Sequence, residues 1–281
     1  MRRVAIIPNP TRDIDFCVTK RVAEKLLSLG LSCYMDAALK YSGINVCYYD
    51  VLPQELDLIV VIGGDGSVIQ ASEYSVKAGV PLVGVNLGKV GYLSEVDPEN
   101  LDIFDSLASG EFWVKEKMLL AVEAIQCEAS KPIHAVNDIV VSHGGYLGLS
   151  TFKLEDGNGN SLVYRADGIV FATPQGSTAY SLSAGGPVVA HDVETIVVTP
   201  VCPHSFFNRS VLFNAAETLM VTNMGSADMK ISVDGRYYSS LKVGERCTIS
   251  MSHDKLKMLT FSNNSMFTEL FTKMNLAEGI K

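Results

Sequence analysis

One short segment of this chain combines the residue types needed to bind and transform a phosphorylated ligand. Residues 63–67 read Gly-Gly-Asp-Gly-Ser and follow the apolar run 58–62. A glycine turn after a buried strand is where α/β proteins place phosphates, because backbone N–H groups can approach the ligand there. Asp65 is the anomaly, since a bare carboxylate repels phosphates unless it binds Mg²⁺ or deprotonates a hydroxyl nucleophile. Either role indicates phosphoryl transfer.

A second segment, residues 172–187, is dense in hydroxyl side chains and glycine. This composition predicts a loop that surrounds an anionic or sugar-bearing ligand with hydroxyls and backbone N–H groups. Pro174, Tyr180 and Pro187 make the segment stiff, which disfavours the alternative of a flexible linker.

Other polar residues interrupt or precede apolar runs. Asn137 and Asp138 stand inside the apolar stretch 135–141 and need partners if they are buried. They form either a hydrogen-bonded bulge or a grip on ribose hydroxyls or an adenine edge. Arg165 and Asp167 are either a surface ion pair at a turn or ligand contacts. Residues 234–236 are either only a hairpin turn or ligand contacts.

Composition limits the classes of partner. The chain has 281 residues, 47% of them hydrophobic, and a formal net charge of −8, which argues against a nucleic-acid-binding surface. None of its six cysteines forms a Cys-x-x-Cys pair, and they are expected to be buried thiols in a reducing, cytoplasmic compartment. The histidines lack metal-ligand spacing, so no metal ligands are predicted. We expect no membrane partner, since no apolar run approaches the ~20 residues of a span, and no signal peptide.

The first ~110 residues alternate strands and helices, which predicts a parallel sheet with right-handed crossovers. Strands are expected at 4–7, 58–62 and 81–85, and helices at 14–29, 68–78 and 101–108. Asp13 is the expected N-cap of the first helix, and a glycine follows each helix.

Strand patterns dominate after residue 112 and predict an all-β sandwich. A turn at residues 156–160 predicts a hairpin. Strands are expected at 118–125, 135–141, 151–154, 162–164, 168–172, 195–198, 211–213, 219–221, 229–233, 247–251 and 256–261. The predicted domains are therefore an α/β domain over 1–112 and a β-sandwich over 113–265, followed by a tail over 266–281. An amphipathic stretch at 267–276 predicts a helix in that tail.

Over nearly its whole length the chain resembles the NAD kinases. The resemblance rests on Asn9-Pro10, the glycine turn, the loop 86–93, Asn137-Asp138, Asp167-Gly168, the segments 173–180 and 183–187, the loop 199–205, and Asp234-Gly235. Phosphofructokinases and the diacylglycerol and sphingosine kinases share the Gly-Gly-Asp-Gly motif. The Thr-Pro-x-Gly-Ser-Thr-Ala-Tyr segment and the Cys-Pro-His-Ser loop are together highly specific.

The resemblance implies a phosphotransferase that moves the γ-phosphoryl group of ATP to the 2′-hydroxyl of the adenosine ribose of NAD, with a divalent metal, usually Mg²⁺. It implies a Rossmann-like N-terminal α/β domain, a C-terminal β-sandwich, a tail that returns to the first domain, and a homodimer or homotetramer. Asp65 would be the catalytic base. The residues that would contact NAD by resemblance are Gly66, Asn137, Asp138, Arg165, Asp167, Thr178, Ala179, Tyr180 and Ser183. The further substrate-binding candidates are Gly63, Gly64, Asn86, Tyr92 and Arg236.

The chain departs from the family pattern at two positions. Ser67 replaces the usual Thr and keeps the hydroxyl, whereas Asp138 replaces the usual Glu and is one methylene shorter, which bears on substrate affinity. Two other functions remain open. A lipid or sphingoid kinase would need an apolar slot that residues 173–183 do not resemble, and a non-catalytic dinucleotide-binding protein would not need Asp65.

Overall fold

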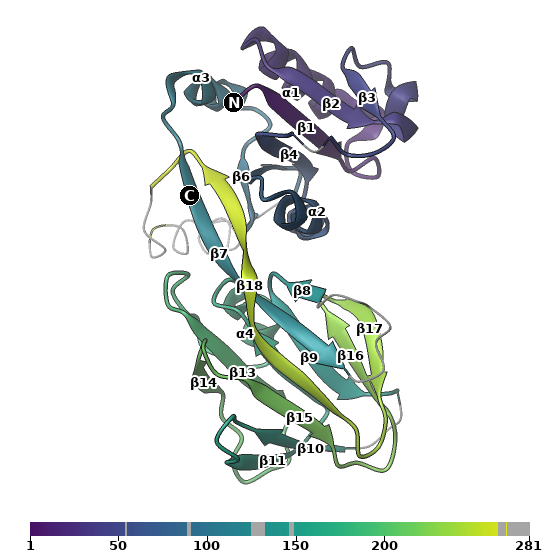
Figure 1. Cartoon of the computed structure of the whole chain (residues 1–281), viewed down its shortest axis with the longest axis vertical. Coiled ribbons are helices and arrows are strands. Elements are labelled where there is room, and N and C mark those ends of the chain that lie inside the picture. The colour runs from purple at the N-terminus through teal and green to yellow at the C-terminus, as the bar shows by residue number, and fades with distance from the viewer. Residues whose placement is uncertain (54, 89–90, 125–132, 146–148, 264–267, 269–281) are drawn as a thin grey trace. The chain divides into compact units, whose positions relative to one another are not determined.

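The computed structural model describes residues 1–281 except 54, 89–90, 125–132, 146–148, 264–267 and 269–281 (Figure 1). The chain divides into two compact units, Met1–Glu116 with Leu256–Lys281, and Lys117–Lys255. The domain boundaries predicted at residues 112 and 265 stay predictions beside this division. The tail at 266–281 and its helix lie outside the described residues, apart from Thr268.

The first unit is a parallel α/β sheet. Its strands are β1 (Arg3–Pro8), β2 (Ser32–Asp36), β3 (Cys47–Tyr49), β4 (Leu58–Gly63), β5 (Leu82–Asn86) and β6 (Ser94–Val96). The order is β3-β2-β1-β4-β5, and the end of β18 (Arg246–Thr260) pairs with β5. This order confirms the Rossmann-like fold. The order reverses between β1 and β4, and such a reversal is where α/β sheets bind ligands, at the carboxyl ends of the strands.

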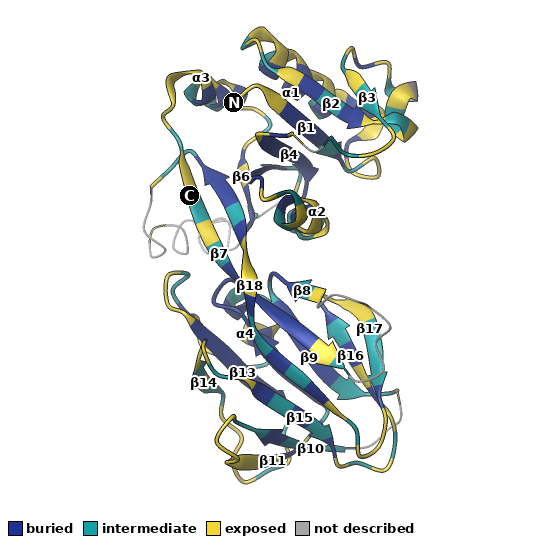
Figure 2. Cartoon of the chain, in the orientation of Figure 1, coloured by how far each residue is buried: buried dark blue, intermediate teal, exposed yellow. Residues whose placement is uncertain are grey.

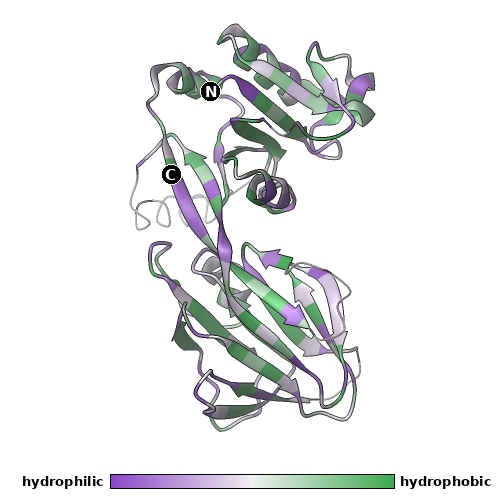
Figure 3. Ribbon diagram, in the orientation of Figure 1, coloured by the Kyte–Doolittle hydropathy of each residue, from purple (hydrophilic) through white to green (hydrophobic). Residues whose placement is uncertain are grey.

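Burial explains why these strands form the centre of the unit. Every residue of β4 is buried, as are Val4, Ala5 and Ile6 of β1 (Figure 2). The corresponding ribbon is apolar along β4 (Figure 3). The main helices are α1 (Cys17–Ser28) and α2 (Asp65–Ala78), and α1 packs through Val22 and Leu26, which helical spacing places on one face.

The first helix begins later than predicted. Asp15 and Phe16 have positive φ values of 55° and 53°, so the chain forms a short 3-10 turn, η1 (Ile14–Phe16), before α1 starts at Cys17. The N-cap residue of α1 is Phe16, so the prediction of Asp13 at that position is wrong, but the Asp13 carboxylate reaches the helix and accepts the N–H groups of Val18 at 3.0 Å and Thr19 at 2.8 Å.

Other differences in the first unit are local. The helix expected at 68–78 begins at Asp65, and that expected at 101–108 is η3 (Leu101–Asp105) followed by α3 (Ser106–Ser109). Strands β2, β3 and β6 and the turn η2 (Ala37–Ser42) were not predicted, because they are short and have little periodicity.

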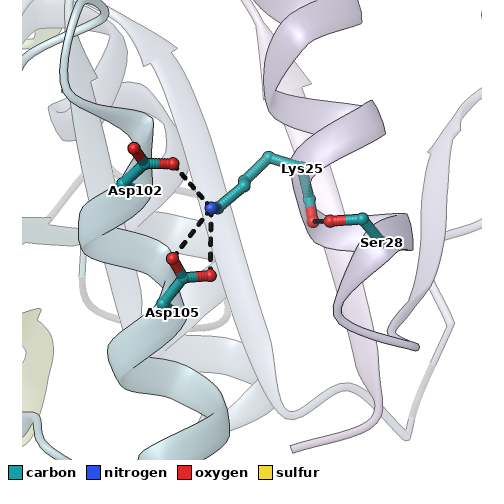
Figure 4. A network of polar contacts seen from close by, with 4 residues as sticks. All are labelled: Lys25, Ser28, Asp102 and Asp105. Carbon is teal, nitrogen blue, oxygen red and sulfur yellow. Dashed lines mark hydrogen bonds and ion pairs between the residues drawn. The ribbon is translucent and has the colours of Figure 1, made fainter.

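Figure 4 shows how Lys25 joins α1 to η3, with its Nζ 2.7 Å from Asp102 and 2.9 Å from Asp105.

The second unit consists of two antiparallel sheets, which confirms the β-sandwich. One sheet has the order β14-β13-β12-β9-β16-β17, and the other contains β11-β10-β15-β18, with β7 paired to β18 and β8. The strands are β7 (Trp113–Ala124), β8 (Ile133–Ala135), β9 (Asp138–His143), β10 (Ser150–Glu155), β11 (Ser161–Ala166), β12 (Gly168–Ala172), β13 (Thr195–Val201), β14 (Val211–Asn214), β15 (Leu219–Asn223), β16 (Met229–Val233) and β17 (Arg236–Leu241). Inward-facing residues of both sheets, among them Phe152, Phe171 and Ile231, form one core.

The strand predictions in this unit need three corrections. The strand expected at 135–141 is two strands, β8 and β9, with a break at residues 136–137. The strands expected at 247–251 and 256–261 are one long strand, β18, and β17 was not predicted. The predicted hairpin turn at 156–160 is confirmed, since the Asp156 N–H donates to the Asn160 carbonyl at 3.0 Å.

The cysteines are less buried than expected. Cys33 and Cys247 are buried, and burial raises the pKa of both thiols to about 12, but Cys17, Cys47 and Cys202 are exposed. All five are free thiols.

Within the described ranges, no helix has the length and apolar character needed to cross a membrane.

Candidate active site

The glycine turn follows β4 at the point where the strand order reverses. Gly63 ends the strand, Gly64 precedes α2, and Asp65 is the first helical residue rather than the centre of a loop. A Cβ at Gly63 would collide with the hydroxyl of Ser67, so the close return of the helix onto the strand requires glycine there. The turn therefore presents the first N–H groups of a 14-residue helix at the edge of the sheet.

The Asp65 carboxylate holds a neighbouring loop in place by hydrogen bonds. Its Oδ2 accepts the N–H of Tyr92 at 2.7 Å. Its Oδ1 accepts the N–H of Leu93 at 3.0 Å, and the N–H and hydroxyl of Ser94 at 3.3 Å and 3.1 Å. Oδ2 thus receives one hydrogen bond from the described residues, and a carboxylate oxygen can accept two. Asp65 is held in a single orientation and retains an acceptor position.

Two asparagines shape the adjoining loops. Asn86, which pairs in register with Gly63, accepts the N–H of Gly88 at 2.8 Å through its side chain. Asn9, directly after β1, donates from Nδ2 to the Ser67 hydroxyl at 2.8 Å. The structure thus joins the loops after β1, β4 and β5. The site prediction did not include Asn9, although its place after a buried strand was a usable signal.

In the second unit, Asn137 and Asp138 lie on a turn that Asp234 holds in place. The Asp234 carboxylate accepts the backbone N–H groups of Val136 at 2.9 Å, Asn137 at 2.8 Å and Asp138 at 3.1 Å. Asp234 itself has a positive φ of 47°, and its N–H donates to the Asp138 carbonyl at 2.9 Å. Asp234 thus binds the backbone of this interruption, and whether the Asn137 and Asp138 side chains contact a ligand stays a prediction.

The Asp138 side chain is 6% exposed. Burial, followed by the negative charge of Asp234, raises the pKa of this carboxyl to about 7, although the Tyr180 N–H acts in the opposite direction. Burial also raises the pKa of Asp234, against the three backbone N–H groups and the Arg236 charge, which lower it. Asp138 therefore exchanges its proton near neutral pH.

The hydroxyl-rich segment is folded rather than loop-like, and the prediction that its hydroxyls surround a ligand is wrong for the buried ones. The segment forms η4 (Gln175–Thr178) and α4 (Tyr180–Ser183). The buried hydroxyls of Thr173 and Ser177 donate to the carbonyls of Val136 and Pro174, both at 2.7 Å. These hydroxyls therefore bind backbone carbonyls inside the fold, and the Pro174 carbonyl also accepts the Ser177 N–H at 3.3 Å.

The outer residues of this segment remain accessible. Tyr180 and Ser183 are exposed, and Thr178 and Ala179 are half-buried. A Cβ at Gly176 would collide with the Asn137 carbonyl, so the segment packs directly on the Asn137 turn.

The structure brings together only some of the site residues that were predicted in the second unit. The turn at 137–138 adjoins residues 176–180, but the register places Asp138 opposite Ala172 and Ser142 opposite Gly168. Asp167, five residues from Ala172, therefore lies just beyond the other end of this ladder, roughly 16–17 Å away at about 3.3 Å per residue. Arg165 is exposed on β11, near Asp167 in sequence, and Arg236 is exposed beside Asp234.

The described residues contain no cluster of three or more His, Cys, Asp or Glu side chains that could hold a metal ion. A single carboxylate at the glycine turn is compatible with Mg²⁺ carried mainly by nucleotide phosphates and water, which is how this ion is commonly bound.

A parallel sheet with a glycine turn and a carboxylate at its reversal point defines a nucleotide-binding α/β unit, here combined with a β-sandwich. Family models identify the same two parts: the ATP-NAD kinase N-terminal domain matches residues 4–108, and the ATP-NAD kinase C-terminal domain matches residues 136–261. The chain belongs to the ATP-NAD kinase family.

Individual relatives agree with this assignment. An NAD kinase from Thermoanaerobacter sp. is 31% identical, over 98% of this chain and 99% of the relative, and one from Lachnoclostridium phytofermentans is 30% identical, over 97% and 99%. Among solved structures, yeast NADH kinase complexed with NADH has a TM-score of 0.83 at 23% identity, covering 98% of this chain and 88% of that one. An Archaeoglobus fulgidus NAD kinase in complex with ATP has a TM-score of 0.74 at 24% identity, covering 98% and 99%.

Proposed function

We propose that the protein is an NAD kinase that transfers the γ-phosphoryl group of ATP to the 2′-hydroxyl of the adenosine ribose of NAD. The observation that carries this proposal is the oriented Asp65 carboxylate at the glycine turn, in a chain that matches both ATP-NAD kinase domains. The bond from the ribose oxygen to the γ-phosphorus forms as the bond to the bridging oxygen breaks. ADP leaves with that electron pair, and NADP⁺ is the other product.

Asp65 is the proposed general base. Phosphoryl transfer asks mainly for positioning and charge neutralisation, together with an oriented nucleophile. The free acceptor position on Oδ2 can take the hydroxyl proton while the other hydrogen bonds keep the carboxylate from rotating. The N–H groups of the turn can bind the phosphates, and Mg²⁺ bound with ATP would supply charge neutralisation.

The proposed NAD contacts in the second unit are the turn at 137–138, the exposed Tyr180 and Ser183, and the half-buried Thr178 and Ala179. Asn137 offers an amide, Asp138 a carboxyl group and Tyr180 an accessible aromatic ring. These groups suit a ribose and an adenine, because they combine hydrogen-bonding side chains with a stacking surface. Asp167, Arg165 and Arg236 remain proposed contacts, although the structure places Asp167 at the other end of the ladder.

The decisive experiment incubates the purified full chain with ATP, Mg²⁺ and NAD and measures NADP⁺ with an NADP⁺-specific coupled assay. Parallel reactions replace NAD by NADH, by sphingosine or by diacylglycerol. NADP⁺ formation that requires ATP supports the proposal. Phosphorylation of a lipid instead would favour the lipid-kinase alternative, and binding of NAD without turnover would favour a non-catalytic role.

We also propose that the enzyme is a cytoplasmic homodimer or homotetramer. The free thiols support a reducing compartment. The second unit exposes large apolar side chains on β11 and on the adjacent loop, where the Arg165 N–H donates to the Ser205 hydroxyl at 2.7 Å. These side chains, Leu162, Val163, Phe206 and Phe207, form the kind of exposed apolar group that marks a protein–protein interface.

A further inference from the structure

The loop after β1 carries a cation that the function proposed above does not yet use. Arg12 follows Asn9 at the point where the strand order reverses, and its guanidinium lies against two glycine turns. A Cβ at Gly64 would be 3.0 Å from Arg12 Nη1, and one at Gly88 would be 3.5 Å from the same atom. Arg12 therefore reaches from the end of β1 across the ends of β4 and β5.

The loop that carries Arg12 is fixed at both ends. The Asn9 N–H donates to the Ile62 carbonyl at 2.8 Å, and the Asn9 carbonyl accepts the N–H groups of Arg12 at 3.1 Å and Asp13 at 2.9 Å. The Asn9 side chain bonds Ser67 on α2, and the Asp13 carboxylate is buried at the start of α1. The position of Arg12 is thus set by the sheet and both helices.

Asp13 and Asp65, the acidic residues at the ends of β1 and β4, accept hydrogen bonds from other groups. Asp13 accepts N–H groups of α1, and Asp65 accepts those of residues 92–94. Within the described part of the chain, no hydrogen bond or ion pair is recorded for the Arg12 side chain. Arg21, by contrast, pairs with Glu99 at 3.1 Å, and Lys25 pairs with two aspartates.

We propose that Arg12 binds the phosphate chain of the donor nucleoside triphosphate at the glycine turn, opposite the helix N–H groups. This proposal rests on the proposed kinase function and extends its site. A planar guanidinium can donate two parallel hydrogen bonds to phosphate oxygens. A chain with a net charge of −8 also needs a local cation to hold a polyanion beside the Asp65 carboxylate.

Placement on the donor side gives Arg12 a defined role. The triphosphate gains negative charge on its leaving bridge oxygen as the γ-phosphorus bond breaks, and a fixed guanidinium stabilises that charge. Glycine at positions 64 and 88 leaves the space that the guanidinium occupies. The effect of losing Arg12 should therefore fall on ATP and much less on NAD.

The test compares Arg12→Ala and Arg12→Lys with the wild-type full chain, and Arg21→Ala serves as a control that removes the same charge from the same unit. We expect Arg12→Ala to lower kcat/KM for ATP about 10- to 100-fold, with KM for NAD within about twofold of wild type. Arg12→Lys should recover part of the loss, and Arg21→Ala should match wild type. The thermal midpoint should change little, because the described residues form no hydrogen bond or ion pair with the Arg12 side chain.

Binding of ATP with Mg²⁺ by calorimetry, without NAD, separates this proposal from the proposed reaction. Weakened ATP binding by Arg12→Ala supports the phosphate contact even if the wild-type chain fails to form NADP⁺. Unchanged ATP binding and unchanged kcat/KM for ATP would overturn the proposal. An equal or larger rise in KM for NAD would also overturn it, because Arg12 would then act on the acceptor.

Discussion

The buried Asp138 carboxyl should make the stability of the second unit depend on pH. The isosteric substitution Asp138→Asn should remove this pH dependence. Asn at this position keeps the size of Asp and can still accept the Tyr180 N–H, but it cannot ionise. Comparing Asp138→Asn with wild type at two pH values therefore isolates the cost of charging this one buried group.

The magnitude follows from the two pKa values. The pKa of Asp138 is about 7 in the folded chain, against 3.8 for an unperturbed aspartate. At 1.36 kcal/mol for each pKa unit, complete ionisation costs the folded state about 4 kcal/mol. Between these pKa values the folded carboxyl keeps a proton that the unfolded chain has released, so stability is lost as pH rises through about 7. From about pH 5.5 to about pH 8, the loss is about 2 kcal/mol.

The assay is urea unfolding of both proteins followed by circular dichroism, with hydrogen exchange of β9 as a local readout. The unfolding free energy of Asp138→Asn minus that of wild type should increase by about 2 kcal/mol from about pH 5.5 to about pH 8. Asp156→Asn is the control, since the pKa of that exposed carboxyl is lowered by hydrogen bonds from Asn160 and Asn158 and it stays ionised over the whole range. A constant difference for Asp138→Asn would refute the assignment of a raised pKa.

Three further predictions address the proposed reaction. Asp65→Asn should lower kcat by roughly 10²–10⁴. It should also reduce stability by about 1–3 kcal/mol, because with the amide oxygen towards Leu93 and Ser94 the NH₂ would face the Tyr92 N–H. Retention of more than about a tenth of kcat would contradict the general-base role. Asp138→Ala should raise KM for NAD about tenfold or more while kcat for ATP-saturated enzyme changes less, and unaltered kinetics would leave Asp138 a structural residue only. Light scattering at micromolar concentration should give the mass of a dimer or tetramer, and substitution of Phe206 by Ser should shift that mass towards the monomer; a wild-type monomer would count against the apolar interface.

Local sequence patterns were sufficient for the fold class. The apolar run at 58–62 and the glycine turn after it predicted a buried strand and a ligand-binding edge, and alternating patterns after residue 112 predicted the sandwich. These features depend on neighbours within a few residues, because side-chain period and turn chemistry are local properties. The segments 173–180 and 202–205 were specific enough to indicate the family that the family models then matched.

Only the tertiary structure decided which hydrogen-bond partner each polar side chain has. Asp65 binds N–H groups 27 to 29 residues away, and Asp234 binds those of residues 136–138, which are 96 to 98 residues away. The hydroxyls of Thr173 and Ser177 turn inward and donate to the carbonyls of Val136 and Pro174. A sequence shows which groups can donate and accept, but only the folded chain brings a donor and an acceptor within 3 Å and removes the competing water.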